Sequence, residues 1–241
     1  MRAKIGWQQI FGMAATISLG VIYLFLWVQM IGNPVERTGT DFIAFYTAGR
    51  IAQENGTSQV YNISLQKKIQ TQTVGFKLAD GQVLLYNHMP FLIPVLFPLI
   101  GPDYVWSFTR WALLSIGIYL TATICLAKLY PETWARREKF LFSAAILTFF
   151  PFFISILLGQ DSAILILGMT FLCLGLLKNN NSLAGVGLVL MLVRPHLCLS
   201  FSIPLFFFRR KVFFIFFILA TALALMSLFL LGKTGVMDFK Y

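Results

Sequence analysis

Long runs of uncharged residues, each near the length that crosses a bilayer, are the feature that most constrains how this chain can fold. An α-helix needs about 20 consecutive apolar residues to cross the hydrocarbon core of a membrane. Five uncharged runs approach that length: Ile5–Gly32, Trp111–Ala127, Phe140–Leu158, Ser162–Leu177 and Val212–Gly232. Only 12% of the 241 residues are charged, about half the share of a soluble globular domain. The sequence therefore predicts an all-α, polytopic membrane protein with a single transmembrane domain, residues 1–241.

The positions of the basic residues predict how the chain is oriented. Short cytoplasmic loops of membrane proteins carry an excess of Lys and Arg. With a cytoplasmic N-terminus, the short cytoplasmic segments gather these basic residues: Arg2, Lys4, Lys128, Arg136, Arg137, Lys139, Lys178, Arg209, Arg210 and Lys211. The long segment 33–87 then lies on the outer face. Contacts with anionic lipid head groups account for the net charge of +10, so we expect membrane lipid and no nucleic acid as a partner.

Two apolar segments are interrupted, and each allows two interpretations. Asn87–Pro102 carries four prolines, and we expect it to be re-entrant or interfacial, because the charge bias reverses if it spans. Ser182–Phe208 is uncharged except around Arg194-Pro195-His196. We expect two short helices that meet there beside a water-filled vestibule, since irregular backbone is not tolerated against lipid. The alternative is a single span with Arg194 at mid-depth.

The outer segment 33–87 is too long for a simple connector and predicts two amphipathic helices that lie on the outer leaflet. Thr40 would cap the first helix, Asp41 would lie in its first turn, and Gly56 would end it. Its apolar face would consist of Phe42, Phe45 and Tyr46. The second helix would run near Val60–Thr73 and is more polar.

On this topology a set of polar and charged side chains converges on the outer face. The set includes both histidines of the chain and consists of Asp41, Arg50, His88, Gln160, Asp161, Arg194 and His196. Asp41 follows the first span, where a carboxylate can act as general base for an acceptor hydroxyl. Arg194 interrupts an apolar stretch, and an ionisable residue at membrane depth indicates a functional site. Its guanidinium can bind phosphate oxygens bidentately.

These residues also have ordinary structural explanations, which the sequence leaves open. The dipole of the following helix would favour a carboxylate at Asp41, and backbone groups at a helix entrance would satisfy His88. Asp161, in the turn that begins at Gly159, would cap the next helix, or else bind a sugar hydroxyl or help to hold a divalent ion. Arg194 would be a side chain that snorkels from a helix end. The sequence contains no P-loop, Rossmann glycine pattern or zinc-ligand spacing.

At these residues the chain resembles glycosyltransferase family 87. Asp41–Arg50, followed by Val60-Tyr61-Asn62, is similar to the pattern that opens the outer loop of that family. Further similar segments follow in the same order: Tyr86–Pro90 with Pro98, Gly159-Gln160-Asp161, and Ala184-Gly185 through Arg194-Pro195-His196. The resemblance extends over roughly residues 5–232.

The resemblance implies a GT-C-like helix bundle that transfers a hexose from a polyprenyl-phosphate sugar to a lipid or glycan acceptor, with inversion. The hexose would be mannose, and transfer would take place at the outer face of a bacterial cytoplasmic membrane. Asp41 would be the general base, and Arg194 would contact the donor phosphate. The expected substrate-binding residues are Arg194, His196, His88, Gln160, Asp161, Arg50 and Tyr46.

Other questions stay open at this stage. No cofactor is expected, whereas a divalent cation, the acceptor and the oligomeric state are undetermined. A transporter or lipid flippase is one alternative, with Arg194 marking a substrate path at mid-depth. An inactive, truncated relative is another, because family members usually continue with several more spans, whereas this sequence ends at 238–241, just beyond a complete span.

Overall fold

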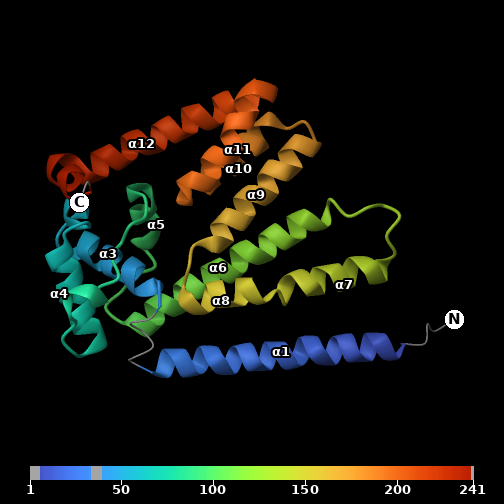
Figure 1. Ribbon diagram of the computed structural model, residues 1–241, viewed down its shortest axis with the longest axis horizontal. Coiled ribbons are helices and arrows are strands. Elements are labelled where there is room, and N and C mark those ends of the chain that lie inside the picture. Colours follow the sequence, from blue (N-terminus) through green and yellow to red (C-terminus); the bar gives the residue numbers. More distant parts are fainter. Residues whose placement is uncertain (1–5, 34–39, 240–241) are drawn as a thin grey trace.

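The computed structural model describes residues 6–33 and 40–239, and over these residues the chain is helical with no β-strand. Four helical stretches are long and apolar enough to cross a membrane: Trp7–Met30, Tyr104–Ala127, Arg136–Leu158 and Arg210–Asp238. The three longest helices, α1 (Trp7–Gly32), α6 (Tyr104–Ala127) and α12 (Arg210–Asp238), run along the length of the molecule (Figure 1). The predicted all-α polytopic architecture is therefore confirmed, while the GT-C arrangement of the bundle stays a prediction.

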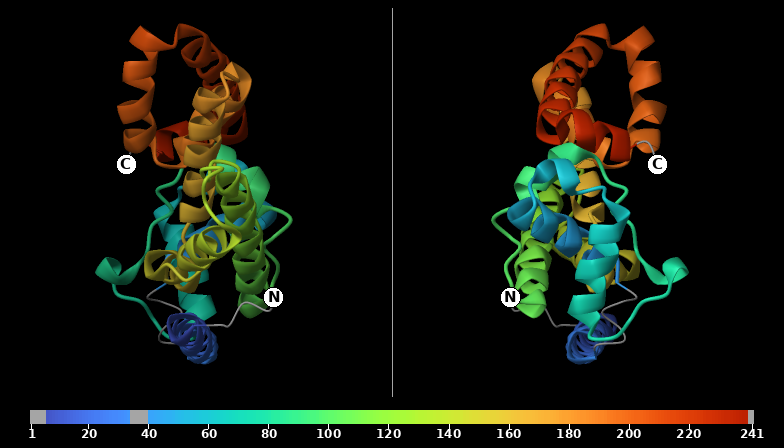
Figure 2. Two further views of the ribbon diagram at one scale, coloured as in Figure 1. Left: turned by 90° about the vertical axis from the view of Figure 1, so that its right-hand side faces the viewer. Right: turned by 90° about the vertical axis from the view of Figure 1, so that its left-hand side faces the viewer.

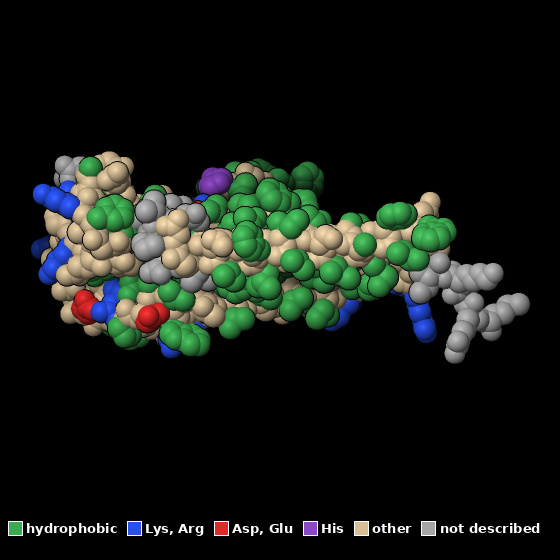
Figure 3. Space-filling view, turned by 90° about the horizontal axis from the view of Figure 1, so that it is seen from below, with side chains coloured by type: hydrophobic (Ala, Val, Ile, Leu, Met, Phe, Trp, Pro, Cys, Tyr) green, Lys and Arg blue, Asp and Glu red, His purple; other side chains and the backbone are tan. Residues whose placement is uncertain are grey.

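The helix α1 lies beside the rest of the bundle. Figure 2 shows it nearly end-on and separate from the main body, and its apolar window is 0% buried. Figure 3 shows hydrophobic side chains along much of the face that includes this helix. Contacts with the bundle come from a few aromatic side chains, such as Tyr23, whose ring stacks on Phe153 with centroids 3.7 Å apart. Such an exposed apolar surface is suited to contact with lipid.

A proline divides the third candidate span. The predicted run Phe140–Leu158 forms α7 (Arg136–Leu147) and α8 (Phe150–Leu158), with Pro151 in the first turn of α8. Proline has no N–H to donate and clashes with the carbonyl four residues earlier. The single uncharged run therefore bends instead of forming one straight helix.

The Arg194 segment is arranged as predicted, with two short helices that meet at this residue. They are α10 (Asn181–Leu190), extended by the 3₁₀ turn Met191–Val193, and α11 (Pro195–Phe208). At a rise of 1.5 Å per residue, α10 is about 15 Å long and α11 about 21 Å, both shorter than the roughly 30 Å hydrocarbon core. Residues 87–102 contain only the 3₁₀ turn Pro90–Leu92 and the short α5 (Ile93–Leu96), so this segment forms no helical span.

The hairpin of α9 (Ser162–Leu177) and α10 is held by close backbone contact. A Cβ atom on Gly175 would lie 2.4 Å from the amide nitrogen of Ala184, and one on Gly187 would lie 2.4 Å from that of Leu172. Small residues let helices approach in this way inside membranes. The contact fixes where α10 ends, and with it the position of Arg194.

The helix α3 (Phe42–Glu54) corrects the expectation of a helix that lies flat on the leaflet. Ten of its 13 residues are buried, because α4 (Ile63–Val74), α5 and α6 pack around it. Small residues on its other faces permit this packing: a Cβ on Gly49 would lie 2.5 Å from Cγ1 of Ile100. The helix also begins later than predicted, with Asp41 instead of Thr40 at its N-cap.

The chain turns lie at two opposite ends of the bundle. The residues 128–135, 178–180 and 209 lie at the end near the N-terminus, and α3, α4 and the C-terminal end of α12 lie at the other (Figure 1). The predicted basic turns thus share one end, as the proposed orientation requires. Which end faces the cytoplasm stays a prediction.

Candidate functional site

The turn between α8 and α9 is the centre of the candidate site. Gly159 adopts a left-handed conformation (φ = 72°), and a Cβ atom there would lie 2.4 Å from Cβ of Phe42 on α3. On its other side, the indole Nε1–H of Trp111 on α6 donates a 2.8 Å hydrogen bond to the carbonyl of Gly159. The turn is therefore clamped between two helices, and the residues that follow it have fixed positions.

The clamp also sets the depth of the site. Trp111 lies seven residues into α6, which begins at Tyr104, or about 10 Å along the helix axis. The turn is therefore recessed from the end of α6. A recessed turn gives its polar side chains a sheltered setting next to the apolar part of the bundle.

Asp161 is the buried anion of the site. Its side chain is 0% exposed, Nη2 of Arg194 lies 2.8 Å from Oδ1, and Nδ1 of His88 lies 3.2 Å from Oδ2. Burial alone would raise the pKa of Asp161, but the His88 imidazole and the Arg194 guanidinium outweigh it and hold this pKa below its ordinary value. The carboxylate is therefore ionised and binds together two segments that are distant in the sequence.

One oxygen of Asp161 is not fully satisfied. The His88 ring is close to Oδ2 but is not aligned as a hydrogen-bond donor, and Oδ2 has no hydrogen-bond partner among the described residues. A buried carboxylate oxygen of this kind retains the capacity to accept one more hydrogen bond.

Asp41 and Gln160 form the second polar contact of the site. The Gln160 amide donates to Oδ2 of Asp41 over 2.6 Å, and Ser162 donates to Oε1 of Gln160 over 3.4 Å. Oδ1 of Asp41 has no such partner in the part of the chain that the structure describes. Gln160 and Asp161 are consecutive, with Cα atoms about 3.8 Å apart, so the Asp41 contact and the Asp161 ion pair both begin at the same turn.

A layer of supporting residues lies behind His88. The Tyr61 hydroxyl donates to the His88 carbonyl over 2.5 Å, and the Phe45 ring lies 4.4 Å from the imidazole between centroids. The buried Gln66 accepts from the Tyr86 amide over 2.9 Å and donates to the Val60 carbonyl over 2.8 Å. Burial raises the pKa of Tyr61, so its hydroxyl stays a neutral donor.

Sequence reasoning gave these supporting residues no role. Tyr61 was part of the resemblance, but only as a pattern residue. Gln66 and Gln70 carry a usable signal, since they lie four apart and flank Ile69, which places all three on the buried side of α4. Trp111 carries no such signal, because the sequence around an indole in an apolar run does not indicate which group its N–H bonds to.

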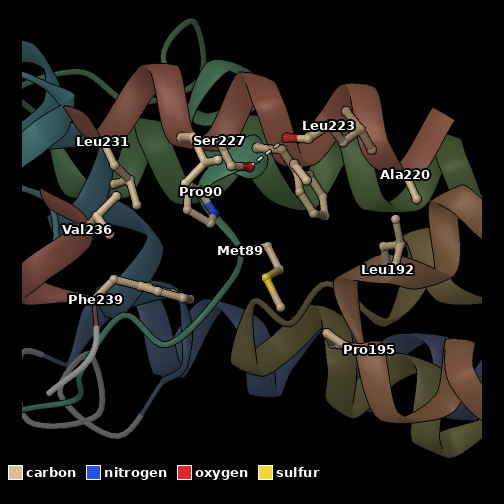
Figure 4. Close-up of a pocket in the computed structure, with 13 residues that line it drawn as sticks. Met89, Pro90, Leu192, Pro195, Ala220, Leu223, Ser227, Leu231, Val236 and Phe239 are labelled. Atoms are coloured by element: carbon tan, nitrogen blue, oxygen red, sulfur yellow. Dashed lines mark hydrogen bonds between the residues drawn. The ribbon is translucent and has the colours of Figure 1, made fainter. Parts of the chain in front are cut away.

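An apolar cavity of about 350 Å³ opens directly beside the charged cluster. Met89 and Pro195, the residues that follow His88 and Arg194, both line it. In Figure 4 the side chain of Met89 projects into the space between α12 and the segment that joins Leu192 to Pro195. The remaining wall is mostly apolar and comes largely from α12, which contributes one polar residue, Ser227, beside Ala220, Leu223, Ala224, Leu228 and Leu231. The basic residues His88 and Arg194 are therefore adjacent in the sequence to residues that line the apolar cavity.

Three of the predicted site residues lie away from this cluster. Tyr46 and Arg50 occupy the opposite face of α3, where the Tyr46 hydroxyl donates to the Pro102 carbonyl over 2.9 Å and Arg50 pairs with Glu54. His196 is exposed, and its side chain has no hydrogen bond or ion pair with other described residues. The structure therefore brings together Asp41, His88, Gln160, Asp161 and Arg194.

Metal ligation has little support from the arrangement of these side chains. Residues 6–33 and 40–239, apart from the side chains too uncertain to describe, contain no group of three or more His, Cys, Asp or Glu that could hold a metal ion. Asp161 is already engaged by Arg194 and approached by His88. The expectation that it helps to hold a divalent ion stays a prediction.

Comparison with known proteins gives one match. Residues 86–240 match glycosyltransferase family 87, which is more than half of the chain. The matched stretch contains His88, Gln160, Asp161 and Arg194, and it begins after Asp41, so it is shorter than the resemblance seen in the sequence. Neither a curated protein nor a solved structure matches the chain significantly.

Proposed function

The chain belongs to glycosyltransferase family 87, a family of membrane glycosyltransferases, and we propose that it transfers a hexose, specifically mannose, from a polyprenyl-phosphate sugar to a lipid or glycan acceptor. Transfer takes place at the outer face of a bacterial cytoplasmic membrane. One observation carries the proposal: the Asp41 carboxylate is held by Gln160, one residue from the buried Asp161–Arg194 ion pair. This arrangement supports the proposal, because the expected base and the expected phosphate-binding cation lie near the same turn.

The donor fits the combination of charge and apolar cavity. Arg194 is 35% exposed in its side chain and uses Nη2 for Asp161, which leaves further N–H donors for a phosphate. With His88, it provides two basic side chains around one carboxylate. The apolar cavity at Met89 and Pro195 suits the first isoprene units of the lipid. A lipid-linked sugar needs these two features and no nucleotide pocket.

The chemical step follows from the position of Asp41. The acceptor hydroxyl gives its proton to Asp41 Oδ1, and its oxygen forms a bond to the anomeric carbon. The bond between that carbon and the phosphate oxygen breaks on the opposite side, and the phosphate leaves with the electron pair. Arg194 stabilises the charge that develops on the phosphate. The sugar is therefore transferred with inversion.

The position of Arg194 favours transfer over transport. In a transporter we would expect this cation to line a path through the middle of the bundle. Instead it pairs with Asp161 at the end of α9 that lies near α3. The flippase and inactive-relative hypotheses both predict that even the wild-type chain transfers no sugar, which gives a direct test.

The test is sugar transfer from a radiolabelled polyprenyl-phosphate mannose in membranes that contain the wild-type chain or its Asp41→Asn variant. Loss of the base should lower the rate by about 10²–10⁴-fold without a change in membrane insertion. Glu132→Gln, an exposed carboxylate at the opposite end, is the matched control and should be as active as wild type. Wild-type activity in Asp41→Asn would remove Asp41 from the mechanism.

A further inference from the structure

A different cavity, which is polar and has a volume of about 340 Å³, lies on the other face of α3. Its walls come from α3, α4 and the start of α6. The residues that give it its chemistry are Tyr46, Arg50 and Glu54 of α3, Gln72 of α4, and Asp103 and Tyr104 at the start of α6. Figure 3 shows acidic and basic side chains side by side at the end of the molecule that carries α3 and α4. The chemical step described above uses none of these residues.

The side chains in this cavity suit an uncharged, hydroxyl-rich ligand. Arg50, Gln72, Glu54 and Asp103 offer hydrogen-bond donors and acceptors with planar geometry. The single cation is already paired with Glu54, and Asp103 adds another negative charge, so an anion is disfavoured. A lipid chain is disfavoured as well, since few apolar side chains line the cavity.

Two tyrosine rings give the cavity a fixed aromatic corner. The rings of Tyr46 and Tyr104 meet edge to face with centroids 5.1 Å apart. The Tyr46 hydroxyl is anchored on the Pro102 carbonyl, so its ring cannot swing away. Aromatic rings beside hydrogen-bonding groups bind molecules that have an apolar face and a polar rim, and a pyranose ring has both.

The cavity is connected to the transfer site through α3. Asp41 is at the N-cap of this helix, and Tyr46 and Arg50 follow by five and nine residues, or about 8 and 14 Å along the axis. The Tyr104 hydroxyl lies 3.0 Å from the hydroxyl of Thr40, the residue before Asp41. One helix therefore carries both the proposed base and two residues of this cavity.

We propose that this cavity binds an uncharged saccharide portion of the acceptor, remote from the hydroxyl that reacts. The inference rests on the proposed function for its role in transfer, but the binding itself does not depend on it. Arg50 and Tyr46 thus act on the acceptor, whereas His88 and Arg194 act on the donor. Two substrates on two faces of one helix leave room for both at the same time.

The test measures binding of free saccharides to the purified protein in lipid nanodiscs by saturation-transfer NMR. The probes are three neutral disaccharides, mannobiose, maltose and lactose, together with mannose 6-phosphate as an anionic probe. At least one neutral probe should bind, with mannose 6-phosphate weaker. Arg50→Ala and Gln72→Ala should each weaken that binding by about tenfold, the effect of one lost hydrogen bond to a charged or planar group.

The matched control is Ser64→Ala, a change at an exposed residue of the same helix as Gln72 that lines neither cavity, and its affinity should equal that of wild type. No binding of any neutral probe, or equal affinity in Arg50→Ala and Gln72→Ala, would overturn the proposal. The Asp41→Asn variant should bind the probe as wild type does. Saccharide binding that depends on Arg50 in a chain without transfer activity would refute the proposed function and the acceptor role, and would leave only the saccharide-binding site standing.

Discussion

At one end of this molecule Asp161 is a buried and paired charge, whereas at the other end the charged side chains are exposed and mostly basic. Asp161 is enclosed between His88 and Arg194 beside α3. At the opposite end Lys178, Arg210 and Lys211 are exposed. The sequence alone does not distinguish the charged residues of one end from those of the other. Burial and pairing, more than charge itself, distinguish a site for chemistry from a signal for orientation.

The difference has an energetic reason. A charge inside the bundle is retained only where a partner compensates for its lost hydration, so its removal disturbs everything attached to it. An exposed lysine at a membrane surface contributes little to folding, since water and salt screen it. Substitutions at the two ends should therefore differ sharply in effect.

The largest effect is expected for Asp161→Asn. This change removes the buried anion and leaves the Arg194 guanidinium without its partner, which should lower the free energy of unfolding by about 3 kcal/mol. Sugar transfer should also be lost, because His88 and Arg194 are no longer held together. Unfolding in an SDS titration and the radiolabel transfer assay measure the two effects. A variant as stable and as active as wild type would show that the ion pair has no role.

A smaller effect is expected for Trp111→Phe. The change removes the hydrogen bond to the Gly159 carbonyl and should lower the free energy of unfolding by about 1 kcal/mol. Transfer should decrease as the turn that carries Gln160 and Asp161 loosens. Trp106→Phe on the same helix is the control, since Trp106 is 65% exposed. If both tryptophan variants behave alike, the clamp on the turn is unimportant.

The smallest effect is expected at the basic end. Lys178→Gln should change the free energy of unfolding by no more than about 0.5 kcal/mol and leave transfer in membranes unchanged. The same SDS titration and transfer assay provide the measurement. A loss of transfer comparable to that of Asp161→Asn would contradict the distinction between the two ends.

Much of the architecture could be predicted from the sequence, because crossing a membrane requires runs of fixed length. Four of the five uncharged runs lie in candidate spans, whereas Ser162–Leu177 forms the shorter helix α9. Arg194-Pro195 located the meeting point of α10 and α11. The break between α7 and α8 was missed, although Pro151 was visible. The burial of α3 was missed because its small residues, such as Ala48 and Gly49, indicate close packing only once the neighbouring elements are known.

The site could be predicted as a set of residues but not as a geometry. The contact between Asp41 and Gln160 joins positions 119 residues apart, and no local pattern specifies such a pair. The sequence does predict that Tyr46 and Asp41 are separated, since five residues at 100° per residue place the two on different faces of a helix. The exposure of His196 depends on how α11 packs, which its apolar sequence does not reveal.

Labelling of single cysteines from outside the cell tests most directly whether the buried, paired end faces outward. The two positions are Asn87→Cys, an exposed neighbour of His88, and Lys178→Cys at the basic end. The wild-type chain gives the background labelling of its own cysteines. All three lie inside helices, where Cys125 and Cys173 are half-buried and Cys198 is buried. A membrane-impermeant maleimide should label Asn87→Cys in intact cells and Lys178→Cys only after permeabilisation. The opposite pattern would place the recess of Asp41 and Asp161 in the cytoplasm and contradict transfer at the outer face.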